Sequence, residues 1–183
     1  MRSLIPLLAF ISLAGCDFDE LLSFRAKFER TVPLDPTGTF RLTNTNGKVR
    51  VETWDRAEVH IEAEKAASSQ DYLEEIQIEV DGQGNRVEVR ARMPRGGFLR
   101  GGHGQVSYLV HVPAGARVEA KTVNGAVEVQ GLAGSVQAST VNGAVRITDS
   151  SGPVGASTVN GSIRAEYRRA PPDGLSEFST TNA

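Results

Sequence analysis

From Val118 onward, apolar and polar residues alternate in short blocks that recur with a fixed period. Residues 118–129 read VEAKTVNGAVEV, residues 136–147 read VQASTVNGAVRI and residues 154–165 read VGASTVNGSIRA, so each block begins 18 residues after the last. A fixed period is typical of stacked units, none of which can bury its apolar side alone. The repeats therefore predict a stack of short strands joined by Asn-Gly turns.

Within each block, alternation assigns every second side chain to a common core, and the turn shifts the register so that both arms face the same core. Alanine at the second inward position of each block predicts two strand layers that lie close together. The residues expected to point inward are Val118, Ala120, Thr122, Val127, Val129, Val136, Ala138, Thr140, Val145, Ile147, Val154, Ala156, Thr158, Ile163 and Ala165.

The period allows two architectures: an antiparallel meander of hairpins, or a right-handed parallel β-helix (solenoid) with about 18 residues per coil. Three identical Thr-Val-Asn-Gly turns favour the β-helix, because like residues then stack into ladders that hydrogen-bond along the axis. Residues 42–51 and 177–182 are divergent copies. The last copy stops half a coil short, which leaves an open edge at Ser162 to Glu166 that invites strand addition or self-association. We therefore expect either a longer natural solenoid or an end that is capped by a partner or a second copy.

Alternating segments before the repeats predict further strands, so the expected fold class is all-β. One short helix is expected to end at Ile76, with Ser68 or Ser69 as its N-cap and acidic residues in its first turns. The β pattern begins at Phe28, and residues 28–183 are expected to form a single solenoid domain. The predicted strands upstream of the repeats include residues 58–63, 76–80, 86–90 and 105–112, the second and third of these as a hairpin across a Gly-rich turn.

The first sixteen residues, MRSLIPLLAFISLAGC, are typical of a secretory signal, because their apolar stretch is too short to span a bilayer. The ending Leu13-Ala14-Gly15-Cys16 resembles the lipobox of bacterial lipoproteins. That resemblance implies cleavage after residue 15, lipidation of Cys16, and a membrane tether over residues 16–27. It also implies a bacterial cell envelope location. Asp17 resembles the inner-membrane retention signal of enteric lipoproteins, which favours the periplasm-facing inner membrane over the cell surface.

Three sequence features together resemble a bacterial family named "putative adhesin", a domain of unknown function. They are the TVNG copies, the stretch NGKVRVETWD at 46–55 and the stretch VHVPAG at 110–115. The resemblance runs from about Phe28 to the C-terminus. It implies a right-handed β-helical envelope protein, often lipid- or membrane-anchored, and it implies no catalytic residues.

Composition narrows the chemistry. The 183 residues carry 20 basic and 22 acidic side chains, a formal net charge of −2, which gives no reason to expect nucleic-acid binding. One cysteine excludes a disulfide framework and a Cys-cluster metal site. The isolated His60, His103 and His111 do not suggest a zinc site, and the TVNG turns lack the Asp of calcium-binding β-rolls. Neither GxSxG, SxxK nor HExxH is present, so we expect no enzyme activity, no metal and no cofactor.

Three sets of residues remain as candidates for a functional role. The Gly-rich segment 95–104 is expected to be a hairpin tip, or else to contact anionic envelope groups through Arg92, Arg95 and Arg100. The outward column Glu128, Arg146 and Arg164 predicts charge pairing between neighbouring coils. The repeat turns are interpreted as structural positions in preference to a ligand face, and they comprise Asn46, Gly47, Asn124, Gly125, Asn142, Gly143, Asn160 and Gly161.

The sequence therefore favours a lipid-anchored, non-enzymatic envelope solenoid that acts as an adhesin-like scaffold, interaction module or sensing module. The expected partners are the membrane, through the lipid, and an envelope protein or glycan. The alternative is a glycan-binding or glycan-active β-helix, which a cluster of carboxylates on one outer face would favour. Val123, Val141 and Val159 each precede the Asn of a repeat turn and are expected to form an apolar strip along the turns. That strip is either an edge of the core or a contact surface.

Overall fold

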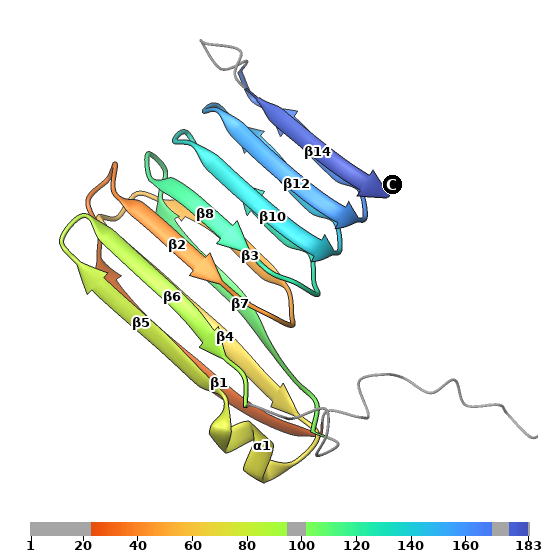
Figure 1. Cartoon of the computed structure of the whole chain (residues 1–183). Coiled ribbons are helices and arrows are strands. Elements are labelled where there is room, and N and C mark those ends of the chain that lie inside the picture. The colour runs from red at the N-terminus through yellow and green to blue at the C-terminus, as the bar shows by residue number, and fades with distance from the viewer. Residues whose placement is uncertain (1–22, 95–101, 170–175, 183) are drawn as a thin grey trace, which may run out of the picture.

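In a computed structural model of the chain, residues 23–94, 102–169 and 176–182 are described. They form an all-β structure of two facing sheets with one short helix at one end (Figure 1). The elements are β1 (Phe24–Pro33), β2 (Thr39–Thr43), β3 (Val49–Trp54), β4 (Glu58–Ala67), α1 (Gln70–Glu75), β5 (Gln77–Gln83), β6 (Arg86–Arg92), β7 (Gly104–Pro113), β8 (Arg117–Lys121), β9 (Val127–Gln130), β10 (Val136–Asn142), β11 (Val145–Ser150), β12 (Val154–Asn160), β13 (Ile163–Tyr167) and β14 (Glu177–Asn182).

The two sheets are mixed. Sheet A has the strand order β1-β4-β7-β3-β9-β11-β13, and sheet B has the order β14-β12-β10-β8-β2-β6-β5. Pairing is antiparallel at one end, between β1, β4 and β7 in sheet A and between β5 and β6 in sheet B, and it is parallel everywhere else. In Figure 1 sheet B lies in front, and β3 and β7 of sheet A lie behind it.

From β8 onward, successive strands alternate between the two sheets and pair in parallel with the equivalent strand of the next repeat. Val118 lies opposite Val136, which lies opposite Val154, so the register between strands equals the period of the sequence. The repeats therefore do not form the antiparallel meander. Parallel pairing brings each Thr-Val-Asn-Gly turn directly onto the next one.

The divergent copy at residues 42–51 belongs to the same stack. Strand β2 pairs with β8, and β3 pairs with β9, both in parallel. The chain then leaves to form β4 through β6 and returns through β7, which lies on the other side of β3. Copies that are far apart in the sequence are thus adjacent in the fold.

The core lies between the sheets and follows the predicted alternation. Val118, Ala120, Val127 and Val129 are all 1% exposed or less, and the matching positions of the next coil are equally buried. Ile163 and Ala165 are only half-buried, because β13 is the last strand of sheet A among the described residues. The inward set is therefore confirmed, with the least burial at that end of the stack.

The opposite end of the stack is closed by β1, β5 and α1. Strand β1 begins at Phe24, ahead of the expected start at Phe28, because alternate apolar side chains of this segment already pack against the core. The guanidinium of Arg30 donates to the carbonyl oxygen of Val80 at 3.4 Å, which links β1 to β5. The predicted hairpin is confirmed as β5–β6.

The short helix is also confirmed. Ser69 is its N-cap, and the Ser69 hydroxyl accepts a hydrogen bond from the backbone N–H of Tyr72 at 3.2 Å. Leu73 and Ile76 are buried beneath it. The helix therefore covers the end of the core that the strands leave open.

Candidate functional site

The turn residues that the sequence singled out form a continuous ladder along one edge of the stack. The side-chain amide of Asn124 donates to the Oδ1 of Asn46 at 2.8 Å, although the two residues lie 78 positions apart. Asn142 donates to Asn124 at 2.7 Å, Asn160 to Asn142 at 2.8 Å, and Asn182 to Asn160 at 3.0 Å. Each inner Asn thus uses its amide as a donor to one coil and its oxygen as an acceptor from another.

The threonine of each turn also bonds to the neighbouring coil. The buried hydroxyl of Thr140 donates to the carbonyl oxygen of Gly125 at 2.9 Å, and that of Thr158 donates to Gly143 at 3.0 Å. In the divergent copy Asn44 replaces the threonine, and its amide donates to the carbonyl of Val106 at 2.8 Å. The turn asparagines and threonines therefore bond to one another and to the backbone between coils, although the Oδ1 of Asn44 is buried without a partner among the described residues.

Glycine is required in these turns by close backbone approach. At Gly143 the φ angle is +157°, and a Cβ placed there would lie 2.2 Å from the carbonyl oxygen of Gly125. The asparagines themselves do not adopt the left-handed conformation that asparagine tolerates, since Asp149 is the one non-glycine residue with positive φ among those described. Asparagine occurs in these turns because its amide extends the ladder.

The valines beside the ladder are neither core nor fully exposed. Val123, Val141 and Val159 have 40%, 38% and 38% of their surface exposed, and they form a narrow apolar strip. The strip lies on the outside of the turns, so it does not contribute to the core.

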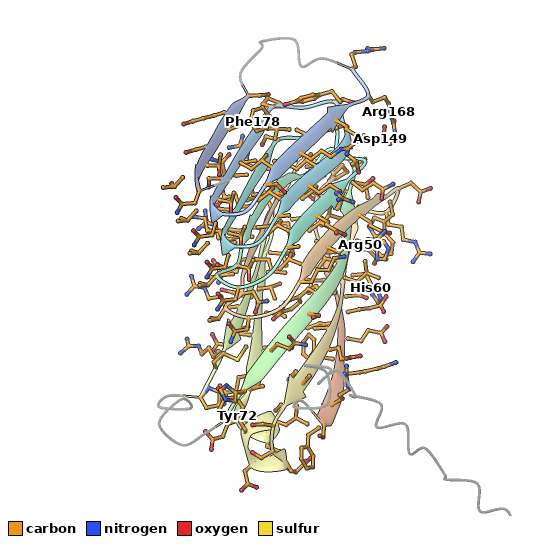
Figure 2. All side chains as sticks on the ribbon, turned by 90° about the vertical axis from the view of Figure 1, so that its right-hand side faces the viewer. Arg50, His60, Tyr72, Asp149, Arg168 and Phe178 are labelled. Carbon is orange, nitrogen blue, oxygen red and sulfur yellow. The ribbon has the colours of Figure 1, made fainter. Side chains whose placement is uncertain are left out.

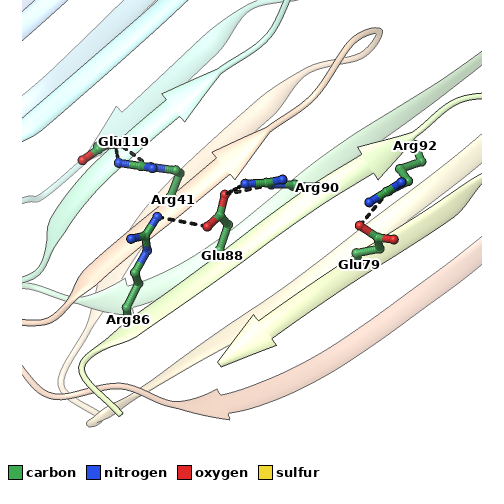
Figure 3. Close-up of polar contacts among 7 residues, drawn as sticks. All are labelled: Arg41, Glu79, Arg86, Glu88, Arg90, Arg92 and Glu119. Atoms are coloured by element: carbon green, nitrogen blue, oxygen red, sulfur yellow. Dashed lines mark hydrogen bonds and ion pairs between the residues drawn. The ribbon is translucent and has the colours of Figure 1, made fainter. Parts of the chain in front are cut away.

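The candidate anion-contact arginines are only partly described. Arg92 forms an ion pair with Glu79 at 2.7 Å (Figure 3). Arg95 and Arg100 lie outside the described residues. The Arg92 charge is therefore shared with a carboxylate on the neighbouring strand.

Arg92 belongs to a wider set of charges on the outer face of sheet B (Figure 3). Glu88 lies between Arg86, at 3.0 Å, and Arg90, and the hydrogen bond from Arg90 lowers the pKa of the Glu88 carboxyl below its usual value. Arg41 pairs with Glu119 at 2.6 Å. These contacts form three separate groups, one within β6, one between β6 and β5, and one between β2 and β8, and they neutralise most of the charge on that part of the sheet.

The expected charge column on sheet A is wrong in its partners. Glu128 and Arg146 lie opposite each other in the strand register, but Glu128 pairs instead with Lys48 at 2.9 Å. Arg164 pairs with Glu166 on its own strand at 2.6 Å. The alternative partners are closer because lysine and arginine side chains extend along the sheet surface as easily as across it.

One cluster, an aromatic group on the outer face of sheet A, was not predicted from the sequence. Trp54 stacks on His111 with ring centroids 5.4 Å apart, and His60 lies 6.2 Å from His111. Arg56 lies over the Trp54 ring at 4.9 Å, and the His60 Nδ1 lies 2.9 Å from the Thr31 hydroxyl. Figure 2 shows His60 and Arg50 projecting from this face.

The cluster forms because the antiparallel register of β4 and β7 sets His60 directly opposite His111. Alternation places both histidines on an outer face, but only the strand register could have shown that they meet. Within residues 23–94, 102–169 and 176–182, no group of three or more His, Cys, Asp or Glu side chains could hold a metal ion. In the same part of the chain, no helix reaches the length and hydrophobicity of a membrane span. Cys16 lies outside it.

Comparison with known proteins gives structural neighbours of low similarity. No family model matches the chain, and no curated protein matches it. A solved structure named as a putative cell adhesion protein from Clostridium sporogenes is 8% identical, with a TM-score of 0.40 over 85% of this chain and 99% of that one.

Two further solved structures are similar. One named as a putative adhesin from Bacteroides fragilis is 12% identical, with a TM-score of 0.35 over 85% of this chain and 97% of that one. One named as a putative lipid binding protein from Parabacteroides distasonis is 8% identical, with a TM-score of 0.38 over 75% of this chain and 59% of that one. At these identities and TM-scores the neighbours do not identify a family for the chain.

Proposed function

We propose that this chain is a lipid-anchored, non-enzymatic protein of a bacterial cell envelope, built as a right-handed parallel β-helix that serves as a scaffold and interaction module. The lipid is attached at Cys16, and the stack of coils projects from the membrane on the segment that follows. The observation that carries the proposal is the use of the repeated polar residues. Asn124, Asn142 and Asn160 hydrogen-bond to one another, and the turn threonines bond to the next coil.

Side chains that are committed to stacking are held in place by two partners and are poorly suited to proton transfer or nucleophilic attack. The repeats therefore contribute rigidity and a regular outer surface. Such a surface favours binding or display over catalysis, because an extended face of similar coils offers the same groups at a regular spacing.

Anchoring is supported by the sequence LAGC at residues 13–16, in which the single cysteine of the chain falls at the position that lipobox processing modifies. Attachment of two or more acyl chains gives firm membrane binding, since each buried CH₂ contributes about 0.8 kcal/mol. The net charge of −2 gives the protein little electrostatic attraction to anionic lipid of its own. Membrane association would therefore depend on the lipid.

The test is the Cys16→Ser variant of the full chain, expressed in a bacterium and followed by membrane fractionation and intact mass. We expect the wild-type protein in the membrane fraction with the mass of a lipidated chain that begins at Cys16. The variant should be soluble or unprocessed. Ser12→Ala, just outside the LAGC sequence, is the matched control and should behave as wild type. Unchanged fractionation and mass in Cys16→Ser would refute lipid anchoring.

A second measurement tests the scaffold role. Crosslinking in the native envelope, followed by identification of the attached molecules, should recover a reproducible envelope partner. Turnover of an envelope glycan by the purified chain would contradict the non-enzymatic assignment.

A further inference from the structure

A groove crosses the outer face of sheet B at the start of its last four parallel strands. Its volume is about 540 Å³, within the range of small-ligand sites. It runs across β8, β10, β12 and β14, on the face turned toward the viewer in Figure 1. It is lined by the polar side chains of Arg117, Glu119, Ser135, Gln137, Ser176 and Glu177 and by the apolar residues Val136, Pro153 and Val154.

Gly155 lies in the middle of this groove, beneath the carboxamide of Gln137. It occupies the interior of β12, in a column where the neighbouring strands carry Glu119, Gln137 and Glu177. Its φ lies outside the left-handed region, so the backbone does not require glycine there. A Cβ at this position would meet only the flexible amide end of Gln137, at 1.9 Å. Glycine within a strand weakens it, and such a residue often marks close approach by a ligand.

The charges of the groove lie at its two ends. Among the residues that the structure describes, Arg117 and Glu177 have no ion-pair partner, whereas Glu119 is already paired with Arg41 at 2.6 Å. Arg117 lies on β8 and Glu177 on β14, three strand spacings or about 14 Å apart across the sheet, and Arg117 lies a further two residues, about 7 Å, along its strand. Within the described part of the chain, the groove thus offers one unpaired cation and one unpaired anion at opposite ends.

The middle of the groove is polar and uncharged. The Ser135 hydroxyl and the Gln137 amide supply both hydrogen-bond donors and acceptors, as a peptide backbone requires. Among the described residues, the lining has no aromatic side chain on which a sugar ring would stack. An extended peptide rises about 3.3 Å per residue, so a tetrapeptide spans about 13 Å. With the reach of the Arg117 and Glu177 side chains, that length covers the distance of about 16 Å between the two backbone positions.

We propose that this groove binds the extended backbone of a short peptide with free termini, with the terminal carboxylate at Arg117 and the terminal ammonium at Glu177. Both ends are then recognised by charge-assisted hydrogen bonds. The backbone of the peptide lies against the Gln137 carboxamide, which covers Gly155 and which a side chain at position 155 would displace. This site is separate from the Asn ladder and does not depend on lipidation at Cys16.

The test uses the full chain, solubilised in detergent, with tetra-alanine as the probe and isothermal titration calorimetry as the measurement. N-acetylated and C-amidated tetra-alanine remove one charge each. We expect tetra-alanine with free termini to bind, and either modification to weaken binding about tenfold, the value of one charge-assisted hydrogen bond.

The variants assign each terminus to its residue. Arg117→Gln should weaken binding of the free peptide about tenfold and remove the effect of amidation, while the effect of acetylation remains. Glu177→Gln should show the reverse pattern. Lys121→Gln, an exposed cation on β8 outside the groove, is the matched control and should bind as wild type.

Gly155→Thr separates binding from folding. Threonine has a higher strand propensity than glycine, so the melting temperature should stay the same or rise while binding is lost. The proposal is overturned if wild type does not bind tetra-alanine at millimolar concentration, or if modification of both termini has no effect. It is also overturned if Arg117→Gln and Lys121→Gln behave alike, or if an acidic oligosaccharide binds in the groove and the tetrapeptide does not.

Discussion

The close contact between successive turns leads to a quantitative prediction for Gly143→Ala. The added Cβ would lie 2.2 Å from the carbonyl oxygen of Gly125 and 2.6 Å from its carbon. Both are backbone atoms held in the ladder, so the two coils must separate by about 1 Å to reach an ordinary contact distance. Alanine must also adopt a left-handed φ, which costs about 1 kcal/mol.

That separation weakens three hydrogen bonds that cross the same gap. They are the backbone bond from Gly125 N–H to the Asn142 oxygen at 2.9 Å, the Asn142 amide bond to Asn124 at 2.7 Å, and the Thr140 hydroxyl bond to the Gly125 oxygen at 2.9 Å. Each contributes about 1 kcal/mol. If two or three are lost, the free energy of unfolding of Gly143→Ala should fall by about 3–4 kcal/mol.

Gly84→Ala is the matched control. Gly84 also has positive φ, +57°, but a Cβ there has no atom within 4 Å. Its expected cost is therefore the conformational term alone, about 1 kcal/mol. Urea unfolding of both variants, followed by far-UV circular dichroism and linear extrapolation, gives the two values. If Gly143→Ala costs no more than Gly84→Ala, close packing of the turns is not what requires glycine.

Two further predictions concern buried polar groups. Thr140→Val should destabilise the protein by about 1 kcal/mol because it removes the hydrogen bond from the Thr140 hydroxyl to the Gly125 carbonyl. Ser139→Val, on the outer face, should change the free energy of unfolding by about 0.5 kcal/mol or less. Equal effects of the two variants in urea unfolding would contradict the assignment of inner and outer faces. The Tyr108 hydroxyl is buried and has no hydrogen-bond partner in the part of the chain that the structure describes, and burial raises the pKa of Tyr108 above its usual value of 10.0. The folded state therefore favours the neutral phenol, and this contribution to stability is complete below pH 10 and is lost as the pH rises above it. Tyr108→Phe should reduce the loss of stability measured between about pH 9 and pH 11, about one unit either side of the free phenol pKa. It should not destabilise the protein at neutral pH. If the stability of the variant falls with pH as steeply as that of the wild type, this reasoning is refuted.

The local features of the fold follow from short stretches of sequence. The alternation of residues 118–129 specified which side chains are buried, because strand side chains point alternately to opposite faces. The β5–β6 hairpin and the helix capped by Ser69 depend on residues next to each other in the chain. The exact 18-residue repeat also indicated parallel stacking, since identical side chains can form ladders only when like positions are adjacent.

The candidate sites were predictable to different degrees. The Asn-Gly positions could be recognised as one set because they share a motif, although their ladder bonds were clear only once the coils were stacked. The partner of Glu128 was not predictable, because Lys48 and Arg146 both lie within reach of its carboxylate and only side-chain geometry distinguishes them. No pattern in the sequence indicated that Trp54, His60 and His111 would meet.

The sequence by itself therefore determined the period, the buried faces, the turns and the all-β class, because each depends on the alternation and turn preferences of neighbouring residues. The tertiary structure alone decided which distant strands pair. It placed β2 between β6 and β8, and β3 between β7 and β9, so that Asn46 meets Asn124 across 78 positions. It also brought Arg117 and Glu177 to opposite ends of one groove. Such distant partners are selected because the correct pairing buries the whole core, and the free energy of that burial depends on all the strands together.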